Sequence, residues 1–177
     1  TDYPTSTPLI VAGAGGGGSY PGSSPGVTTE SGGNYIGSSC SSNCGVPGTN
    51  GNGSESPEGI NGTSGAGGFY SDGEEQWYQL YAGNDIIATT AYGFVNGGVG
   101  SKMNPGGHEG GFGGGGCTHP NGGATGGAPG GGYSGGAPAH NGSSAGGGGG
   151  SFIANDALLL AESGVKIGHG MVNITWS

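Results

Sequence analysis

Apolar side chains gather in three parts of the chain, and glycine-rich segments separate these parts. The first is Leu9–Ala12, a short β-branched run that predicts a strand. The second is a central block, 76–95, in which 77–81 and 86–92 are apolar enough to pack. These two runs predict a β-hairpin, and a short helix is the alternative for the second run.

The third apolar part is the C-terminal stretch 152–177. It opens with Phe152–Ala154, and residues 165–167 and 171–176 then alternate apolar with polar side chains. Alternation with a period of two is typical of half-buried strands. Strands at both ends of the chain with glycine between them predict a glycine-rich insert in a small antiparallel β-sheet.

Short runs of glycine occupy much of the chain between these parts, and each is closed by a nearby aromatic residue or cysteine. The runs are Gly15 to Gly18, Gly113 to Gly116, Gly130 to Gly132 and Gly146 to Gly150. Such runs are either disordered or packed as extended helices of the polyproline-II type, here polyglycine II, with three residues per turn. These helices have no internal hydrogen bonds, so every N–H group needs a partner on a neighbouring helix.

The composition changes this picture in one respect. The 51 glycines and 10 prolines among 177 residues are typical of low-complexity sequence. The eight Tyr, four Phe and two Trp, however, lie near the ends of the glycine runs, which favours an ordered fold. We therefore expect one domain over 1–177, mainly irregular and β: an extended segment and strand (1–14), a glycine-rich bundle (15–151) and C-terminal strands (152–177).

The charge of the chain is strongly acidic. The formal net charge is −9, and Lys102 and Lys166 are the only lysines or arginines, which argues against nucleic acid as a partner. No stretch approaches the roughly 18–20 apolar residues that span a bilayer, so no membrane span is expected in this chain. Without an initiator Met or a signal peptide, Thr1 is interpreted as the start of a mature or excised chain.

Cysteines and glycosylation sequons both indicate an extracellular or cell-surface protein. Cys40, Cys44 and Cys117 allow one internal disulfide and one remaining thiol. The bridge is either Cys40–Cys44 or a link from one of these two residues to Cys117. Possible N-glycosylation sites, each in an Asn-X-Ser/Thr sequon, are Asn52, Asn61, Asn141 and Asn173.

The sequence offers little that points to catalysis. Asp72, Glu74 and Glu75 form one acidic cluster, which predicts a solvated turn; a calcium site is the alternative, although the spacing of a calcium loop is incomplete. No Ser or Cys has a recognisable nucleophile setting, and no phosphate-loop Lys follows a glycine run. We therefore expect no enzyme activity, no bound metal and no cofactor.

The aromatic residues near the glycine runs are expected to cover the ends and flanks of the glycine-rich segments. A sugar- or protein-binding patch is the alternative. The residues concerned are Phe69, Tyr70, Phe112, Tyr133 and Phe152.

The order of these motifs carries a family resemblance. The strand 9–13 before a glycine run, the runs 110–117 and 130–136, and the turn Gly168–Gly170 with its following strand occur in this order. Over nearly its whole length the chain resembles the glycine-rich extracellular domain of the anaplastic lymphoma kinase and leukocyte tyrosine kinase receptors. The resemblance implies polyglycine-II helices that grow out of a small tumour-necrosis-factor-like β-sandwich, and a basic cytokine ligand.

The chain also departs from that family. The resemblance places ligand-contacting acidic residues on either side of His169, where this chain has Ile167 and Met171, and an aromatic contact at Leu159. The chain begins almost at the first glycine strand, so we expect that the upstream strands of the family's sandwich were either cut off or replaced by something else that completes the sheet. An incomplete sheet exposes edges that another chain can extend. The candidate interaction surface comprises Asp72, Glu74, Glu75, Ile167, His169 and Met171.

Two functions follow from these observations. The first is a non-enzymatic extracellular structural module that self-assembles, as a subunit of a surface filament, appendage, matrix or adhesin. Its partner is another copy of the chain. The second is the ligand-binding glycine-rich region of a receptor-tyrosine-kinase-like ectodomain, whose partner is an extracellular protein such as a cytokine.

Overall fold

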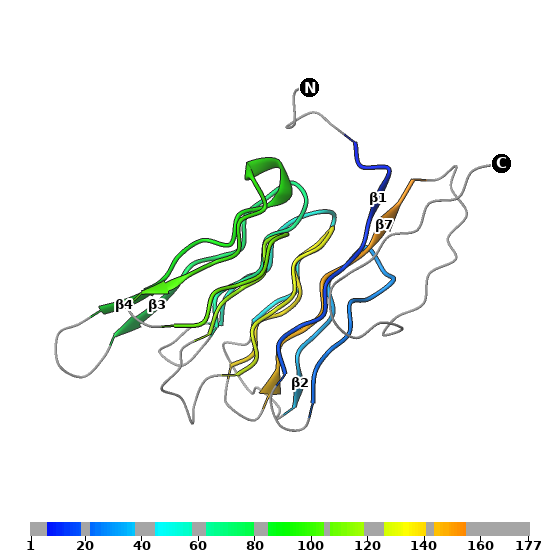
Figure 1. The fold of residues 1–177 in the computed structure, drawn as a ribbon. Coiled ribbons are helices and arrows are strands. Elements are labelled where there is room, and N and C mark those ends of the chain that lie inside the picture. Colours follow the sequence, from blue (N-terminus) through cyan, green and yellow to red (C-terminus); the bar gives the residue numbers. More distant parts are fainter. Residues whose placement is uncertain are drawn as a thin grey trace.

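Extended segments of the chain lie side by side in a computed structural model of the protein, and no α-helix occurs among the described residues (Figure 1). The residues that the structure describes are 7–18, 22–37, 45–57, 63–79, 85–104, 107–118, 126–140 and 144–154. In this part of the chain no helix is long and apolar enough to cross a membrane.

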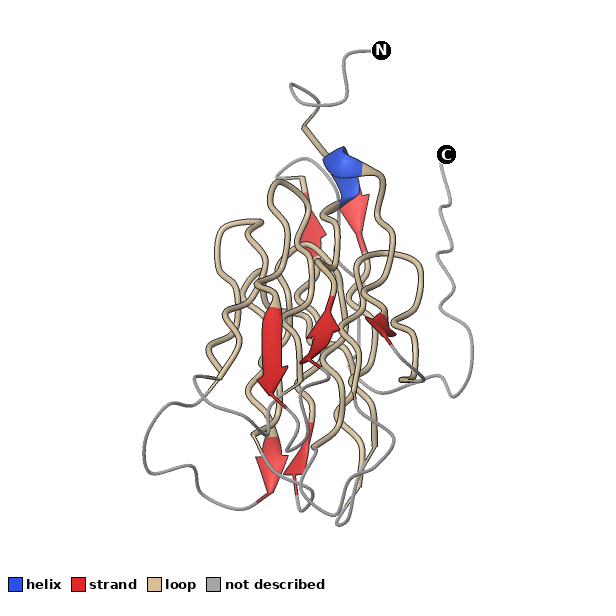
Figure 2. Cartoon of the chain, turned by 90° about the vertical axis from the view of Figure 1, so that its left-hand side faces the viewer, coloured by secondary structure: helices blue, strands red, loops and turns tan. Residues whose placement is uncertain are grey.

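Short strands form three antiparallel sheets among these residues (Figure 2). The pairs are β1 (Ile10–Val11) with β7 (Phe152–Ile153), β2 (Ile36–Gly37) with β6 (Ser144–Ala145), and β4 (Asp85–Ala88) between β3 (Gln76–Gln79) and β5 (Met103–Asn104). A single-turn 3-10 helix, η2, spans Phe94–Asn96. The prediction of a mainly irregular and β fold is confirmed.

Two of the predicted elements are present. Strands β3 and β4 pair in antiparallel register, with Trp77 opposite Ile87, so the second run of the central block is a strand and not a helix. The apolar run at the N-terminus forms β1, and Val11 lies opposite Phe152 of β7. The strands predicted at 165–167 and 171–176 lie outside the described residues.

Segment 144–154 runs through the middle of the extended segments and is bonded to several of them. Its main-chain hydrogen bonds reach other segments in a repeat of three residues, at distances between 2.8 and 3.2 Å. With the donor named first, the pairs are Gly146–Gly17 and Gly149–Ala14, then Gly147–Ala137 and Gly150–Ser134, then Gly130–Gly147 and Tyr133–Gly150. Residues three apart therefore face the same neighbouring segment.

The glycines of this segment are required by space. A Cβ atom added at any residue from Gly146 to Gly150 would collide with a main-chain carbonyl oxygen of a neighbouring segment. None of the five has a positive φ, so their backbone conformation does not itself demand glycine. The absent Cβ allows the Cα hydrogens to approach these carbonyl oxygens, a weak contact that recurs where backbones pack closely.

The run from Gly113 to Gly116 differs from the other runs. Gly113 and Gly114 have φ values of 91° and 82°, and they form a turn between segments 107–112 and 115–118. At Gly113 the left-handed backbone requires glycine. Space does not require it, because a Cβ there would meet nothing within 4 Å. This run is thus a turn followed by an extended segment.

Few large side chains are buried in the described part of the chain. The buried apolar side chains are mostly alanines, and Phe69, Tyr133, Met103 and Cys117 are the larger members. Because glycine and alanine bury little apolar area, the close packing of main chains contributes much of what holds this fold together.

Candidate interaction site

A row of aromatic rings connects segments that are far apart in the sequence. Phe94 stacks on Phe69 with ring centroids 5.2 Å apart, and Tyr133 stacks on Phe152 at 4.6 Å. Phe69 and Tyr133 are 6.5 Å apart and join the two pairs. The ring of Tyr70 lies edge-on to Phe69 at 4.9 Å. We call these five residues the aromatic row; such pairs contribute about 0.5–1.5 kcal/mol each beyond their buried area.

Main-chain hydrogen bonds hold the row in place. The N–H group of Phe69 donates to the carbonyl of Tyr133 at 2.7 Å, and that of Val95 donates to the carbonyl of Phe69 at 3.1 Å. Gly51, with φ of 82°, lets the chain turn beside the row, because a Cβ there would collide with the ring of Tyr70. The positions of the rings are therefore set by the backbone.

The row is buried at its centre and open at one end. Phe69 and Tyr133 are 6% and 7% exposed, whereas Phe94 and Tyr70 are 46% and 39% exposed. A partner molecule can therefore contact the row through Phe94 and Tyr70.

The structure brings four of the five aromatic residues expected to cover the glycine-rich segments into this row. Phe112 is the exception, because it lies at the turn before Gly113 and is 84% exposed. Phe94 was missed by sequence reasoning. The sequence feature that predicts the other four residues is present at Phe94 too, because Phe94 is an aromatic residue closely flanked by Gly93 and Gly97.

Asp72 attaches η2 to the neighbouring segment. Its Oδ1 atom accepts hydrogen bonds from the N–H group of Gly93 at 2.7 Å and from Nδ2 of Asn96 at 2.8 Å. Because Phe94 lies between these two donors in the chain, Asp72 also fixes the exposed end of the aromatic row.

The other two acidic residues of the cluster have different partners. Oε2 of Glu74 accepts from the N–H group of Ser56 at 2.8 Å, and Oε1 of Glu75 accepts from the hydroxyl of Thr90 at 2.7 Å. Within the described ranges, no three His, Cys, Asp or Glu side chains are grouped so as to hold a metal ion. The three carboxylates are therefore not grouped as the calcium alternative requires: Asp72 and Glu75 bond to different residues of segment 85–104, and Glu74 bonds to Ser56.

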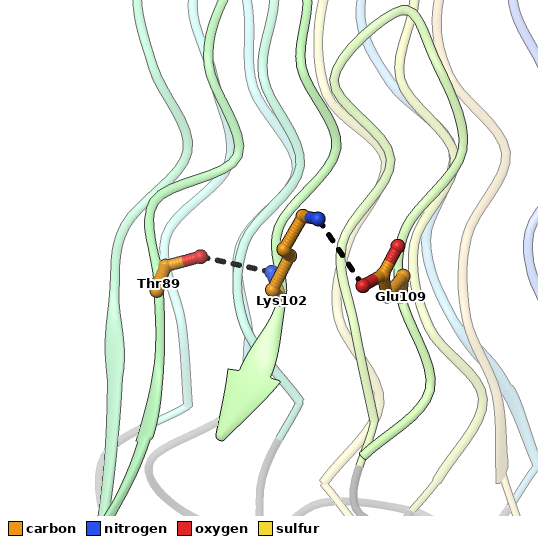
Figure 3. A network of polar contacts seen from close by, with 3 residues as sticks. All are labelled: Thr89, Lys102 and Glu109. Carbon is orange, nitrogen blue, oxygen red and sulfur yellow. Dashed lines mark hydrogen bonds and ion pairs between the residues drawn. The ribbon is translucent and has the colours of Figure 1, made fainter. Parts of the chain in front are cut away.

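An exposed polar network joins three neighbouring segments, and Figure 3 shows it. The main-chain N–H of Lys102 donates to the hydroxyl of Thr89 at 2.9 Å, and Nζ of Lys102 lies 3.2 Å from Oε1 of Glu109. Both charged side chains are more than half exposed, so this ion pair contributes little to stability.

Cys117 is a buried free thiol, 1% exposed. Its Sγ accepts a hydrogen bond from Ser64 Oγ at 3.5 Å, and the same hydroxyl oxygen lies 2.8 Å from Ser101 Oγ. Burial raises the pKa of the thiol above its ordinary value of 9.0, although hydrogen bonds from Ser101 and Ser64 lower it. A buried neutral thiol is a poor nucleophile.

Several predicted site residues cannot be placed. Because Cys117 is a free thiol, it forms no bridge to Cys40 or Cys44, and these two cysteines lie outside the described residues. The same holds for Ile167, His169 and Met171 of the candidate interaction surface, and for the sequons at Asn61, Asn141 and Asn173.

The sequon at Asn52 is placed. Asn52 is exposed, and its Nδ2 atom donates to the carbonyl of Thr49 at 3.0 Å while its Oδ1 accepts from the hydroxyl of Ser71 at 3.2 Å. Ser54, the third residue of this sequon, is only 2% exposed. The side chain of Asn52 thus takes part in the turn that it occupies.

Comparison of the chain with protein-family models, with curated proteins and with solved structures found no match. The described features of the site are a half-exposed aromatic row, carboxylates bonded to main-chain and side-chain donors of neighbouring segments, and a thiol shielded from solvent. These features suit contact with another molecule through a fixed surface.

Proposed function

We propose that this protein is a non-enzymatic extracellular structural module that self-assembles, and that its glycine-rich segments form a bundle of polyglycine-II helices. The observation that carries the proposal is the hydrogen bonding of Gly146 to Gly150. Residues three apart in this run bond to the same neighbour, as a helix of three residues per turn requires. The carbonyl oxygens that any Cβ in the run would meet explain why the run contains only glycine.

Such a bundle suits a structural role. The polar groups of its main chains are used in bonds between segments, so the bundle holds its shape and presents a fixed surface. Large apolar side chains lie on that surface, among them Leu9 at 60%, Val99 at 49% and Phe112 at 84% exposure. Exposed apolar residues on a rigid acidic body provide sites where copies can associate.

Electron microscopy and sedimentation velocity of the purified chain test this proposal, across a range of protein concentrations and with and without reductant. Regular filaments or discrete oligomers that grow with concentration support it. Monodisperse single particles at every concentration would remove its basis. The comparison with reductant shows whether a disulfide between copies takes part.

A second candidate function is ligand binding, as in the glycine-rich region of a receptor-tyrosine-kinase-like ectodomain. The open end of the aromatic row favours it, because Phe94 and Tyr70 are exposed beside the carboxylate of Asp72. Aromatic faces next to a carboxylate attract cationic groups. Surface plasmon resonance against a panel of basic secreted proteins tests it: binding should occur and should be lost in Phe94→Ser.

A further inference from the structure

Three exposed apolar residues form a patch beside η2, which we call the η2 patch: Tyr92, Val99 and Phe112. Their exposed fractions are 43%, 49% and 84%. The N–H group of Tyr92 donates to the carbonyl of Val99 at 2.8 Å, and that of Gly113 donates to the carbonyl of Gly98 at 2.7 Å. These bonds place Phe112 next to Gly98, and a Cβ at Gly98 would lie 3.7 Å from the ring of Phe112. The three exposed residues therefore lie on neighbouring parts of the chain.

The segment that carries Phe112 contains a glycine without an evident role in a single copy. Gly111 has no positive φ, and a Cβ at this position would meet nothing within 4 Å. It therefore differs both from Gly146 to Gly150, which are required by space, and from Gly113, which is required by its backbone. No described residue forms a hydrogen bond with Phe112. Gly111 is exposed and has no side chain, and its carbonyl oxygen accepts from the N–H group of Gly115 at 3.0 Å. The missing side chain leaves room here for close approach by the main chain of another molecule.

Strand β1 lies on the opposite side of the bundle. It pairs only with β7 among the described strands. Leu9, the residue before the strand, and Ile10 within it are 60% and 37% exposed. In Figure 1, β1 and the coiled ribbon of η2 lie toward the same end of the extended segments but on opposite sides of the bundle.

We propose that the η2 patch of one copy docks on strand β1 of the next copy, in a head-to-tail contact. This inference rests on the proposed self-assembly and names the surfaces that carry it. A formal net charge of −9 makes copies repel one another, so contact is favoured where neither surface carries an unpaired charge. Both surfaces are apolar, and the carboxylate on segment 107–112, Glu109, is paired with Lys102.

The placement of the two surfaces determines the type of assembly. Two different surfaces on opposite sides of one molecule make a heterologous contact, which repeats from copy to copy. Such a contact gives an open filament unless its rotation closes a ring.

Two variants and one matched control test this proposal. Phe112→Glu changes the η2 patch, Leu9→Glu changes the β1 surface, and Val46→Glu changes a comparably exposed apolar residue outside both. Sedimentation velocity is measured at a concentration where the wild-type chain assembles. Each patch variant should remain monomeric, whereas the control should assemble. Thermal unfolding of the monomers should show the same midpoint for all variants, because all three positions are exposed.

An equimolar mixture of the two patch variants is the decisive sample. The Leu9→Glu chain keeps its η2 patch and the Phe112→Glu chain keeps its β1 surface, so the mixture should form dimers that grow no further. Monomers only, or assembly by either variant alone, would overturn the head-to-tail contact while the proposed self-assembly stands. A wild-type chain that stays monomeric at every concentration would instead overturn the self-assembly itself.

Discussion

At the scale of single residues, glycine has three different roles in this chain. Gly148 is required by space, because a Cβ there would meet the carbonyl oxygen of Pro25. Gly113 is required by its left-handed backbone, with φ of 91°. Gly111 meets neither requirement in a single copy. The roles are distinguished by the surroundings of each residue, since the residue type is the same.

Gly148→Ala and Gly111→Ala form a matched pair that tests these roles. We expect Gly148→Ala to lower the free energy of unfolding by several kcal/mol, the range of an overpacked or strained core, or to prevent folding. Gly111→Ala should change it by about 0.5 kcal/mol or less. Urea unfolding at a concentration where the chain is monomeric measures both. Equal, small effects would show that main chains do not pack closely around segment 144–154.

Cys117 should be protected from alkylation in the folded protein. Burial excludes the reagent and raises the pKa of the thiol, so little thiolate is present near pH 8. We expect iodoacetamide to modify Cys117 at least about tenfold more slowly in buffer than in urea. Peptide mass spectrometry distinguishes Cys117 from Cys40 and Cys44. Equal rates in the two solvents would contradict the burial of this side chain.

At the scale of elements, the strands are too short to be stable alone. Sheets of two-residue strands such as β1 and β7 form because the segments that carry them are already held side by side. Side chains add links between segments that the strands do not provide. Asp72 is one such link, because a single carboxylate oxygen accepts from Gly93 and Asn96 at the two ends of η2.

Removing the Asp72 carboxylate should loosen η2. Asp72→Ala eliminates two hydrogen bonds to an ionised group, and we expect a loss of about 2 kcal/mol in the free energy of unfolding. Glu75→Ala is the control: its carboxylate is exposed and bonds to the hydroxyl of Thr90, so its loss should cost about 0.5 kcal/mol or less. Hydrogen exchange at the Gly93 amide should become faster in Asp72→Ala alone. An unchanged exchange rate would show that Asp72 does not hold η2.

The pattern of apolar residues within short stretches of sequence predicted the strands that pair with close neighbours or begin in an apolar run. The hairpin β3–β4 and strand β1 follow from short apolar and β-branched runs. Strand β2 was not predicted, because Ile36 pairs with Ala145 more than a hundred positions away and nothing near either residue indicates the pairing. Four members of the aromatic row were predicted from the sequence. Phe112 was expected to cover a glycine-rich segment but lies exposed at the turn before Gly113, whereas Phe94, which was not predicted, joins the row at the turn before Gly97.

At the scale of the whole molecule, buried titratable groups make stability depend on alkaline pH. Burial raises the pKa of Cys117 from 9.0 and that of Tyr133 from 10.0. The unfolded chain then releases these protons at lower pH than the folded chain. The stability they contribute is therefore complete below the unfolded pKa values and is lost as pH rises through the folded ones.

We accordingly expect the free energy of unfolding to fall as pH rises above about 9, the range in which an unfolded thiol begins to ionise. Urea midpoints at pH 7, 9 and 10.5 measure this decline. Cys117→Ser should remove the component that begins near pH 9, because serine does not ionise there, and should leave the component near pH 10. A constant midpoint up to pH 10.5 would show that neither group is buried in its neutral form.

The central position of segment 144–154 determines when the protein can fold. The N–H group of Gly13 donates to the hydroxyl of Ser151, 138 positions later, and the carbonyls of Ala14 and Gly17 accept hydrogen bonds from the same late segment. The first part of the chain therefore lacks several of its partners until the last described segment has been synthesised. Contacts so distant in sequence form slowly. We therefore expect the chain to become ordered in a late, cooperative step, after segment 144–154 has joined the earlier segments.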